Sequence, residues 1–326
     1  MNDPSRDIGL NKNRVDSDRY SRPKTQAMES IVPSKPRFKL ENDVVLAAET
    51  RLRIEEAINK IKYRDVIYYK WNFISVDPDG IGLSLSLYGR PGTGKTLIAE
   101  AIAGTLELPF INISLADLES KFMGETSKNI QAIFKTANEH NAIIFFDEAD
   151  TILGRRLSSV TQGIDNEVNA CRSTLLIELE KFQGITIFAS NFVENYDKAF
   201  QNRISYHVHI PLPDLSARKS IWRRFLISSI PLAQDREELI EKVSETTDGF
   251  SGRDIRTVMR LALPKLFCDE NSFATRKLGL HHLEEAISQV KQAQADVGQY
   301  VNPHSLADIA KSRYLLGIKQ KEEKGE

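Results

Sequence analysis

Cysteine and long apolar runs are the scarcest features of this sequence. Its 326 residues include two cysteines, Cys171 and Cys268, and neither has neighbours at the spacing of metal ligands. A disulfide is therefore not indicated, which is typical of a reducing compartment. No apolar run approaches the roughly 18 residues of a membrane span, and the first residues are polar rather than signal-like. These absences predict a soluble, cytoplasmic protein.

An excess of one charge is also missing. The 44 Lys and Arg residues nearly balance the 45 Asp and Glu residues, which leaves a formal net charge of −1. This balance excludes a global attraction to nucleic acid or to an anionic membrane, but it leaves a local basic patch open. The hydrophobic share of 41% is ordinary for a globular chain. A chain of this length is expected to hold two domains.

Residues 1–37 show almost no apolar periodicity. Four prolines are scattered here among polar and charged residues. Such a stretch cannot bury enough apolar surface to offset the entropy of ordering. We expect a flexible tail, with a short partner-binding arm as the alternative. From Val44 to Val66 apolar residues recur at helical spacing, which predicts a helical lead-in.

Strands and helices alternate over the next part of the chain. The run AIIFFD at 142–147 is typical of a central parallel strand buried on both faces. Further strands are expected at 83–88, 109–115, 185–190 and 207–210, with helices between them at 96–106 and up to about residue 139. This alternation predicts an α/β domain with a parallel sheet over residues 38–212.

Helices alone follow Pro211 and Pro213. They are expected near 214–229, 235–246, 252–267 and 280–294. Ser251 and Asp254 form a capping box in front of the third. We therefore predict a small all-helical lid domain over residues 213–295. Residues 296–326 are expected to hold a further helix and a charged tail.

The segment GRPGTGKT at 89–96 matches the phosphate-binding loop pattern, with a strand before it and a helix after it. Its glycines let backbone N–H groups point at phosphates, and the helix N-terminus adds positive potential. Lys95 is expected to reach the β- and γ-phosphates, and the Thr96 hydroxyl to bind Mg²⁺. A glycine turn without a ligand is the alternative. The predicted nucleotide-binding residues are Gly89, Pro91, Gly92, Thr93, Gly94, Lys95, Thr96 and Leu97.

Two carboxylates follow the strand at 142–147. Asp147 would hold Mg²⁺ through its water shell, and Glu148 is placed to orient and deprotonate the attacking water. Acids that only cap the next helix are the alternative. The tetrapeptide 147–150 also spells the second motif of DEAD-box RNA helicases. The Ser-Ala-Thr motif and the second large α/β domain of those enzymes are missing from the sequence.

With these motifs the sequence resembles the AAA+ ATPases over residues 40–295. The resemblance implies that Asn191, at the end of the strand 185–190, is the sensor-1 residue that helps to position the lytic water. It implies that Arg203 is an arginine finger, which reaches the γ-phosphate in a neighbouring subunit. The site would then be complete only in an oligomer, typically a hexameric ring. Arg253 in GFSGRDIR resembles the sensor-2 arginine.

The sequence departs from the family pattern at two positions. Many members carry two arginines in a longer R-P-G-R loop, whereas this chain offers only Arg203, which puts a second finger in doubt. Many also have alanine where this chain has Arg253, which points away from the protease-linked and membrane-fusion branches. Without their context, Arg203 would be read as a surface charge and Asn191 as a turn former.

A candidate substrate-gripping loop lies between the second and third strands. Lys121, Phe122, Met123 and Gly124 resemble the aromatic–hydrophobic–glycine pore loop of polypeptide-translocating AAA+ rings. A bulky apolar side chain on a flexible glycine loop can grip an extended peptide without reading its sequence. Ordinary packing of Phe122 and Met123 on a helix face is the alternative. The polar segment 155–168 is a weaker candidate for a second pore-facing loop.

The predicted function is ATP-driven remodelling or unfolding of a protein by an oligomeric ring, with ATP and Mg²⁺ as cofactors. The short segment with Arg203, together with SGRDIR, resembles the pachytene-checkpoint type of remodeller. That resemblance implies a HORMA-domain protein as substrate, with or without an adaptor, and in bacteria a role in antiphage signalling. No H-E-x-x-H motif is present, so a fused zinc protease is excluded.

Two other functions are the alternatives. A DNA-associated AAA+ ATPase of the loader or initiator type would need a basic pore or an added helix-turn-helix. A slow nucleotide-dependent switch would not need the full set of Glu148, Asn191 and Arg203. Neither a membrane nor a nucleic-acid partner is expected.

Overall fold

A computed structural model describes residues 32–114, 126–153, 163–191, 196–267 and 276–300. The chain divides into two compact units, residues 1–32 and 33–326. All helices and strands described below belong to the second unit. In this described part, no helix is long and apolar enough to cross a membrane.

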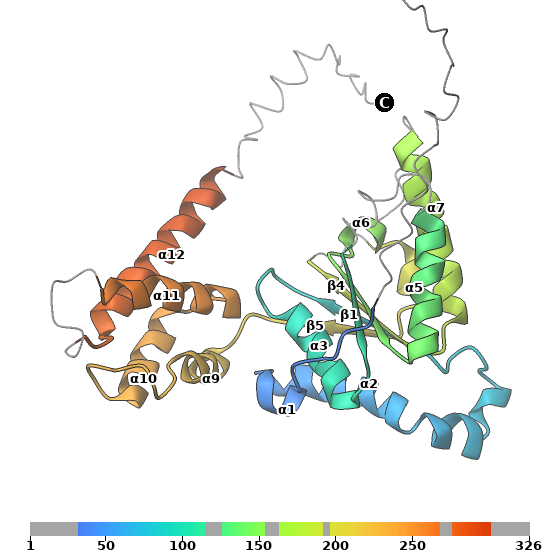
Figure 1. The fold of residues 1–326 in the computed structure, drawn as a ribbon, viewed down its shortest axis with the longest axis horizontal. Helices are drawn as coiled ribbons and strands as arrows, with labels where there is room; N and C mark the ends of the chain where they lie inside the picture. Colours follow the sequence, from blue (N-terminus) through green and yellow to red (C-terminus); the bar gives the residue numbers. More distant parts are fainter. Residues whose placement is uncertain (1–31, 115–125, 154–162, 192–195, 268–275, 301–326) are drawn as a thin grey trace, which may run out of the picture. The chain divides into compact units, whose positions relative to one another are not determined.

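A five-stranded parallel sheet organises the first part of this unit, in the order β2-β3-β4-β1-β5 (Figure 1). The central strands β3 and β4 carry the apolar runs, and every residue of β4 is buried. The predicted parallel α/β sheet is therefore confirmed. The strands are β1 (Leu83–Tyr88), β2 (Phe110–Ser114), β3 (Ile143–Asp147), β4 (Ile185–Ser190) and β5 (Tyr206–His209).

Helices cover both faces of the sheet (Figure 1). On one face, α2 (Ala48–Lys62) and α3 (Lys95–Leu106) share a buried apolar cluster with Ile143 and Phe145 of β3. On the other face, α5 (Thr126–His140) lies beside α7 (Gly163–Lys181), and Phe134 of α5 packs near Phe146 of β3. Both faces are covered, and accordingly β3 is apolar and buried from Ile143 to Phe146 while β4 is buried along its whole length.

Short elements connect these layers. The helix α1 (Leu40–Asp43) precedes α2, and a π-helical turn at Asp65–Lys70 and a 3₁₀ turn at Phe73–Ser75 follow it. The helix α6 (Asp150–Leu153) begins three residues after β3 ends, and α8 (Lys198–Gln201) precedes β5. The predicted helical lead-in is present, but its helix begins at Ala48 rather than near Val44.

Among the described residues, four helices follow the sheet, as predicted: α9 (Leu215–Phe225), α10 (Arg236–Thr246), α11 (Gly252–Lys265) and α12 (Leu280–Tyr300). They enclose their own apolar cluster around the fully buried Trp222. The predicted capping box is confirmed, because Ser251 and Asp254 exchange side-chain and backbone hydrogen bonds at the start of α11. The first helix was expected to run to residue 229 but ends at Phe225.

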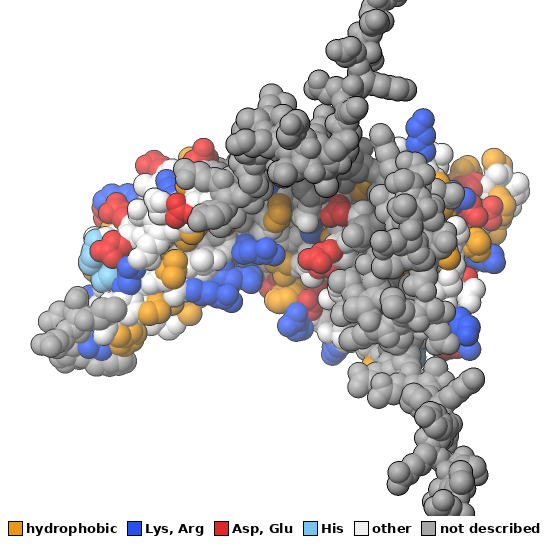
Figure 2. All heavy atoms as spheres, turned by 90° about the horizontal axis from the view of Figure 1, so that it is seen from above, with side chains coloured by type: hydrophobic (Ala, Val, Ile, Leu, Met, Phe, Trp, Pro, Cys, Tyr) orange, Lys and Arg blue, Asp and Glu red, His pale blue; other side chains and the backbone are white. Residues whose placement is uncertain are grey.

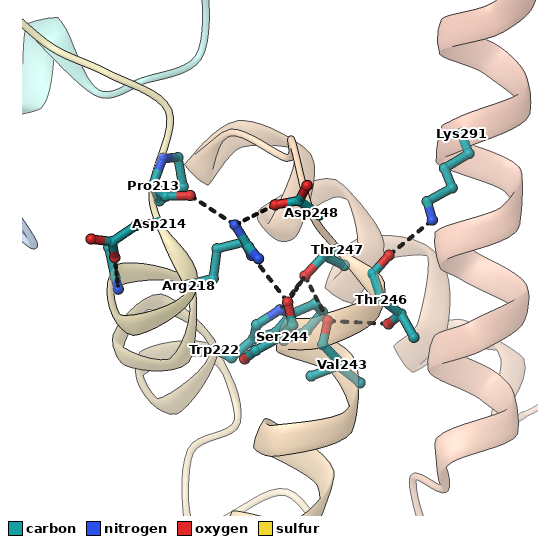
Figure 3. Close-up of polar contacts among 11 residues, drawn as sticks. Pro213, Asp214, Arg218, Trp222, Val243, Ser244, Thr246, Thr247, Asp248 and Lys291 are labelled. Carbon is teal, nitrogen blue, oxygen red and sulfur yellow. Dashed lines mark hydrogen bonds and ion pairs between the residues drawn. The ribbon is translucent and has the colours of Figure 1, made fainter.

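A buried arginine ties the start of this helical domain to its second helix (Figure 3). The side chain of Arg218 in α9 donates to the carbonyl of Pro213 and to the carbonyl of Ser244 in α10, both at 3.0 Å. It also pairs with Asp248 at 2.9 Å. These contacts join the connection from the sheet to the end of α10.

Residues 33–37 differ from the expected tail. Ser34 and Phe110 exchange two backbone hydrogen bonds of 2.8 Å, so the chain adds an antiparallel bridge to the edge strand β2. Arg37 then pairs with Glu100 of α3. The predicted tail, residues 1–37, therefore overlaps this attached segment. Hydrogen bonds of Ser34 and the ion pair of Arg37 hold this segment, and such polar contacts leave no apolar periodicity in the sequence.

Candidate nucleotide-binding site

The glycine loop 89–94 leaves the end of β1 in a conformation that side chains would obstruct. A Cβ atom on Gly89 would lie 2.2 Å from the carbonyl oxygen of Ile210. Gly94 has a φ of +96° and is the N-cap of α3, which begins at Lys95. The first N–H groups of a helix have no partner within the helix and are free to bind an anion. The loop and α3 therefore have the form of a phosphate cradle.

Lys95 lies inside this cradle. Its ammonium donates to the carbonyls of Gly89 at 2.7 Å and Arg90 at 3.1 Å, and to the Oδ1 atom of Asn191 at 2.8 Å. Burial lowers the pKa of the Lys95 ammonium, while the charges of Asp147 and Asp150 act in the opposite direction. The two carbonyls and the amide oxygen hold the ammonium where a phosphate of a bound nucleotide would meet it.

Thr96 and Asp147 place two oxygen ligands side by side. The hydroxyl of Thr96 donates to the Oδ2 atom of Asp147 at 2.9 Å. Asp147 is the last residue of β3, and its register partner in β2 is Ser114. Mg²⁺ prefers oxygen ligands and usually completes its shell with waters and nucleotide phosphates. One hydroxyl and one carboxylate beside a phosphate cradle fit that ion.

Glu148 follows in a left-handed conformation. Its φ is +52°, and its N–H donates to the Oδ1 atom of Asp147 at 2.9 Å. This conformation is uncommon for residues other than glycine, and such strain tends to cluster at functional sites. The turn leaves the Glu148 side chain exposed beside the predicted metal ligand, where a general base would have access to water.

Asp150 contacts the end of β4, and the sequence analysis predicts no role for it. Its carboxylate accepts hydrogen bonds from the Ser190 hydroxyl and from the N–H of Asn191. These bonds join the turn after β3 to the end of β4. The only signal in the sequence is a third acid after Asp147 and Glu148, which reads equally well as a helix cap.

The start of α11 reaches the glycine loop. The N–H of Arg253 donates to the carbonyl of Gly92 at 3.2 Å. A Cβ atom on Gly92 would lie 2.6 Å from the Ser251 hydroxyl and 2.9 Å from the Arg253 Cβ. The positive charge of Arg253 also contributes to lowering the Lys95 pKa. The predicted sensor-2 residue is thus brought to the phosphate cradle.

Arg203 lies away from this cradle. It forms an ion pair with Glu180 of α7, and its guanidinium donates to the carbonyl of Ala199 at 3.1 Å. Two residues later, the N–H of Ser205 bonds to Ser84 near the start of β1. The glycine loop follows the opposite end of β1. Arg203 therefore lies at the amino ends of the strands, and the fold does not bring it to the phosphate site of its own chain.

Two predicted loops fall wholly or partly outside the described residues. The pore-loop candidate, residues 121–124, lies outside them. The weaker candidate at 155–168 lies outside them up to residue 162, and its last part differs from expectation because α7 begins at Gly163.

Comparison with known proteins finds a family match over most of this site. Residues 85–212 match the family described as "ATPase family associated with various cellular activities (AAA)". The cell division cycle protein 48 homolog of Archaeoglobus fulgidus is 31% identical over 292 residues, covering 84% of this chain and 38% of that protein. The proteasome-activating nucleotidase of Methanopyrus kandleri is 36% identical over 179 residues, covering 53% of this chain and 40% of that protein.

A solved structure supports the fold assignment. The crystal structure of the FIGL-1 AAA domain in complex with ADP superposes with a TM-score of 0.64, at 23% identity, covering 83% of this chain and 92% of that chain. The present chain spans about two-fifths of the length of the two curated relatives. Residues 85–212 thus match the AAA ATPase family, and the fold and the phosphate cradle agree with that match.

Proposed function

We propose that this chain is one subunit of an oligomeric ring that uses ATP hydrolysis to remodel or unfold a protein. The position of Arg203 carries this proposal. Lys95, Asp147 and Asn191 gather at the carboxyl ends of the strands, while Arg203 lies at the amino ends. An arginine so placed can complete a phosphate site only in another chain, which requires a head-to-tail arrangement of subunits.

In the proposed mechanism the loop 89–96 and the first turn of α3 bind the phosphates of ATP. The Lys95 ammonium would exchange its carbonyl partners for phosphate oxygens. Thr96 and Asp147 would hold Mg²⁺, which would neutralise phosphate charge when bound. Glu148 would take the proton of the attacking water, and Asn191 would help to place that water.

The remodelling part of the proposal rests on the loop between β2 and α5. Lys121, Phe122, Met123 and Gly124 provide the aromatic and apolar side chains that would grip an extended peptide. The similarity to a protein named proteasome-activating nucleotidase is consistent with a protein substrate for this chain. A HORMA-domain substrate stays the finer prediction, which rests only on the short Arg203 segment and SGRDIR.

The main alternative is a DNA-associated ATPase. Binding of a phosphate backbone is favoured by Lys and Arg clustered in a stripe or patch. On the face of the described residues that Figure 2 shows, basic and acidic side chains both occur across the surface. The net charge of −1 agrees with that mixture. Both observations favour a protein substrate.

A trapping experiment tests the proposal. The Glu148→Gln chain is expected to bind ATP without hydrolysing it, so that substrate stays engaged and can be identified by crosslinking and mass spectrometry. The control is the same chain with Lys95→Ala, which should bind neither ATP nor substrate. A trapped folded protein, of HORMA type or another, would support remodelling. Trapped nucleic acid would favour the DNA-associated function, and the ATPase alone would favour a slow switch.

A further inference from the structure

One carboxylate joins the two strand ends that form the catalytic part of the site. Asp150 is the first residue of α6, in the turn that also carries Asp147 and Glu148. Its Oδ1 atom accepts the hydroxyl of Ser190, and the N–H of Asn191 lies 3.0 Å from Oδ2 and 3.2 Å from Oδ1. Two consecutive residues at the end of β4 are thus held by a single side chain.

Buried hydroxyl groups form a hydrogen-bonded chain that ends at this carboxylate. Ser190, Tyr196 and Ser86 are at most 2% exposed. The hydroxyls of Ser86 and Tyr196 are 3.0 Å apart. Burial raises the pKa of the Tyr196 phenol, and the hydrogen bond between Tyr196 and Ser190 acts in the opposite direction. A chain of hydroxyls thus connects β1 to the carboxylate. A buried polar network of this kind fixes geometry when its members are satisfied.

The consequence falls on Asn191. A backbone hydrogen bond of 2.8 Å from the N–H of Ala149 to the carbonyl of Ala189 also joins the turn after β3 to β4. With its own N–H bound to Asp150, Asn191 directs its Oδ1 atom to the Lys95 ammonium at 2.8 Å. Asp150 itself has no role in the nucleotide-binding or metal-binding set proposed above.

We propose that Asp150 is a positioning residue, which fixes the Asn191 amide relative to Glu148 and Lys95 and so determines where the attacking water is held. This inference rests on the proposed role of Asn191. The chemistry explains why an acid is needed at this position. An ionised carboxylate only accepts hydrogen bonds, and the Ser190 hydroxyl and the Asn191 N–H both donate to it. An amide at position 150 would turn an NH₂ group toward at least one of these donors.

The Asp150→Asn variant tests this idea because it keeps the shape of the side chain. A shift of about 1 Å in a positioning group can cost on the order of 100-fold in rate. We expect kcat to fall about 10-fold to 100-fold while the dissociation constant for ATP stays unchanged, because the lost interaction serves only the transition state. The control is Asp214→Asn, the same change at the N-cap of α9, which should leave kcat unchanged.

A double-mutant cycle with Asn191→Ala separates positioning from a general loss of structure. If Asp150 acts through the Asn191 side chain, the double variant should turn over no more slowly than Asn191→Ala alone. Multiplied losses would show an independent role and overturn the inference. If Asn191→Ala retained wild-type turnover, the proposed role of Asn191 would fail first. If only Asp150→Asn retained it, positioning alone would fail.

A second variant keeps the inference testable if Asp150→Asn does not fold. Ser190→Ala removes one donor to the carboxylate and leaves the N–H of Asn191 in place. It should lower kcat less than Asp150→Asn, and again without a further loss in the Asn191→Ala background. Full activity of a folded Ser190→Ala chain with an unchanged melting temperature, together with an unfolded Asp150→Asn chain, would assign Asp150 to stability and reject positioning.

Discussion

At the residue scale, the predicted general base Glu148 has a strained backbone conformation. Its φ of +52° places a residue with a side chain in the left-handed region, which costs about 1–2 kcal/mol relative to the right-handed one. The Glu148 side chain is exposed, so burial does not offset the strain. A residue retained under these conditions is better explained by its chemistry than by its contribution to stability.

This reasoning gives a prediction for Glu148→Gly and Glu148→Ala. Both should lose turnover by about 100-fold or more, because a general base contributes 10²–10⁴-fold. The Glu148→Gly variant should have a free energy of unfolding about 1 kcal/mol larger than that of Glu148→Ala, because only glycine adopts the left-handed conformation without cost. It should therefore unfold at a higher temperature. Thermal unfolding of the purified chains measures this. Equal stability of the two would contradict the strain argument.

The sequence was sufficient to predict residues whose chemistry is local. The glycine loop, Asp147 and Asn191 each follow an apolar strand, and parallel strands bring such positions to one edge. The structure places them together, and their catalytic roles stay predictions. Asp150 could not be recognised in this way, because its partners lie 40 and 41 residues away. Only the packing of β4 against β3 brings them together.

At the element scale, residues 33–39 attach the N-terminal side of the chain to the helix that carries Lys95 and Thr96. Arg37 donates three hydrogen bonds to Glu100 of α3, two from its guanidinium and one from its backbone N–H. Glu100 is only 9% exposed. The hydrogen bond with the Arg37 side chain is the main reason why the pKa of the Glu100 carboxyl lies below its ordinary range.

We expect Arg37→Ala to lower the melting temperature at neutral pH, because it leaves a buried carboxylate with one partner fewer. A depressed folded-state pKa means that the stabilisation is present above the unfolded pKa of about 4.3 and is lost as the pH falls through the folded pKa. The difference from wild type should therefore shrink in acid. Melting curves between neutral pH and pH values below 4.3 measure this.

Lys39→Ala is the control from the same segment. Lys39 pairs with Glu107 at 3.2 Å, but both side chains are more than half exposed, and exposed pairs contribute little. Its melting temperature should match wild type at every pH. A loss in Arg37→Ala that does not depend on pH would assign the effect to packing rather than to the Glu100 charge.

The contact between the glycine loop and α11 gives a second prediction at this scale. Gly92 and Gly249 have similar φ values of +82° and +77°, but only Gly92 has atoms within 4 Å of an added Cβ. Alanine at either position carries the left-handed cost of about 1–2 kcal/mol. Only Gly92→Ala should also weaken ATP binding, by on the order of 10-fold, since it pushes Ser251 and Arg253 from the loop.

Nucleotide titrations of Gly92→Ala and Gly249→Ala separate strain from collision. Adding Ser251→Gly to Gly92→Ala removes the nearest colliding atom, the hydroxyl at 2.6 Å. Glycine is a tolerable N-cap, with a loss of only a few tenths of a kcal/mol. Partial recovery of ATP affinity is expected. No recovery would mean that distortion of the glycine loop itself is responsible.

Element boundaries show where sequence patterns stop being informative. The strand 185–190 was predicted with its observed bounds, because six buried residues in a row leave a clear signal. The attachment of Ser34 to Phe110 was missed, since it depends on backbone hydrogen bonds between residues 76 positions apart. The aromatic stretch that follows α2 forms a π-helical turn, and no periodic pattern in the sequence indicates one.

At the scale of the whole molecule, remodelling requires a grip on substrate that is separate from hydrolysis. We expect Phe122→Ala to keep basal ATPase activity and to lose unfolding of a substrate protein, because the residue lies in the predicted pore loop and not among the phosphate-binding residues. Unfolding of a trapped substrate and ATP turnover should be measured on the same preparation. Wild-type unfolding by this variant would remove the pore-loop hypothesis.

The proposed role of Arg203 predicts that the active unit is several chains rather than one. Its guanidinium is engaged by Glu180 and Ala199 in its own chain, and it lies at the end of β1 opposite to the glycine loop. Arg203→Ala should therefore bind ATP with wild-type affinity. Its turnover should fall by about 10³–10⁵-fold if the residue acts as a finger on a neighbouring phosphate.

Mixing two inactive variants tests the direction of this contact. Arg203→Ala keeps an intact cradle, and Lys95→Ala keeps an intact finger, so a site between them is complete when the first supplies the cradle and the second the finger. Random equimolar rings would contain such sites at a frequency of one half times one half, or about a quarter of all sites, for a head-to-tail interface. Turnover should therefore return to about a quarter of wild type. Replacing the Lys95→Ala partner by a chain that carries both substitutions should abolish the recovery. If the first mixture stays inactive although mixed rings form, Arg203 does not act across subunits and the ring proposal loses its main support.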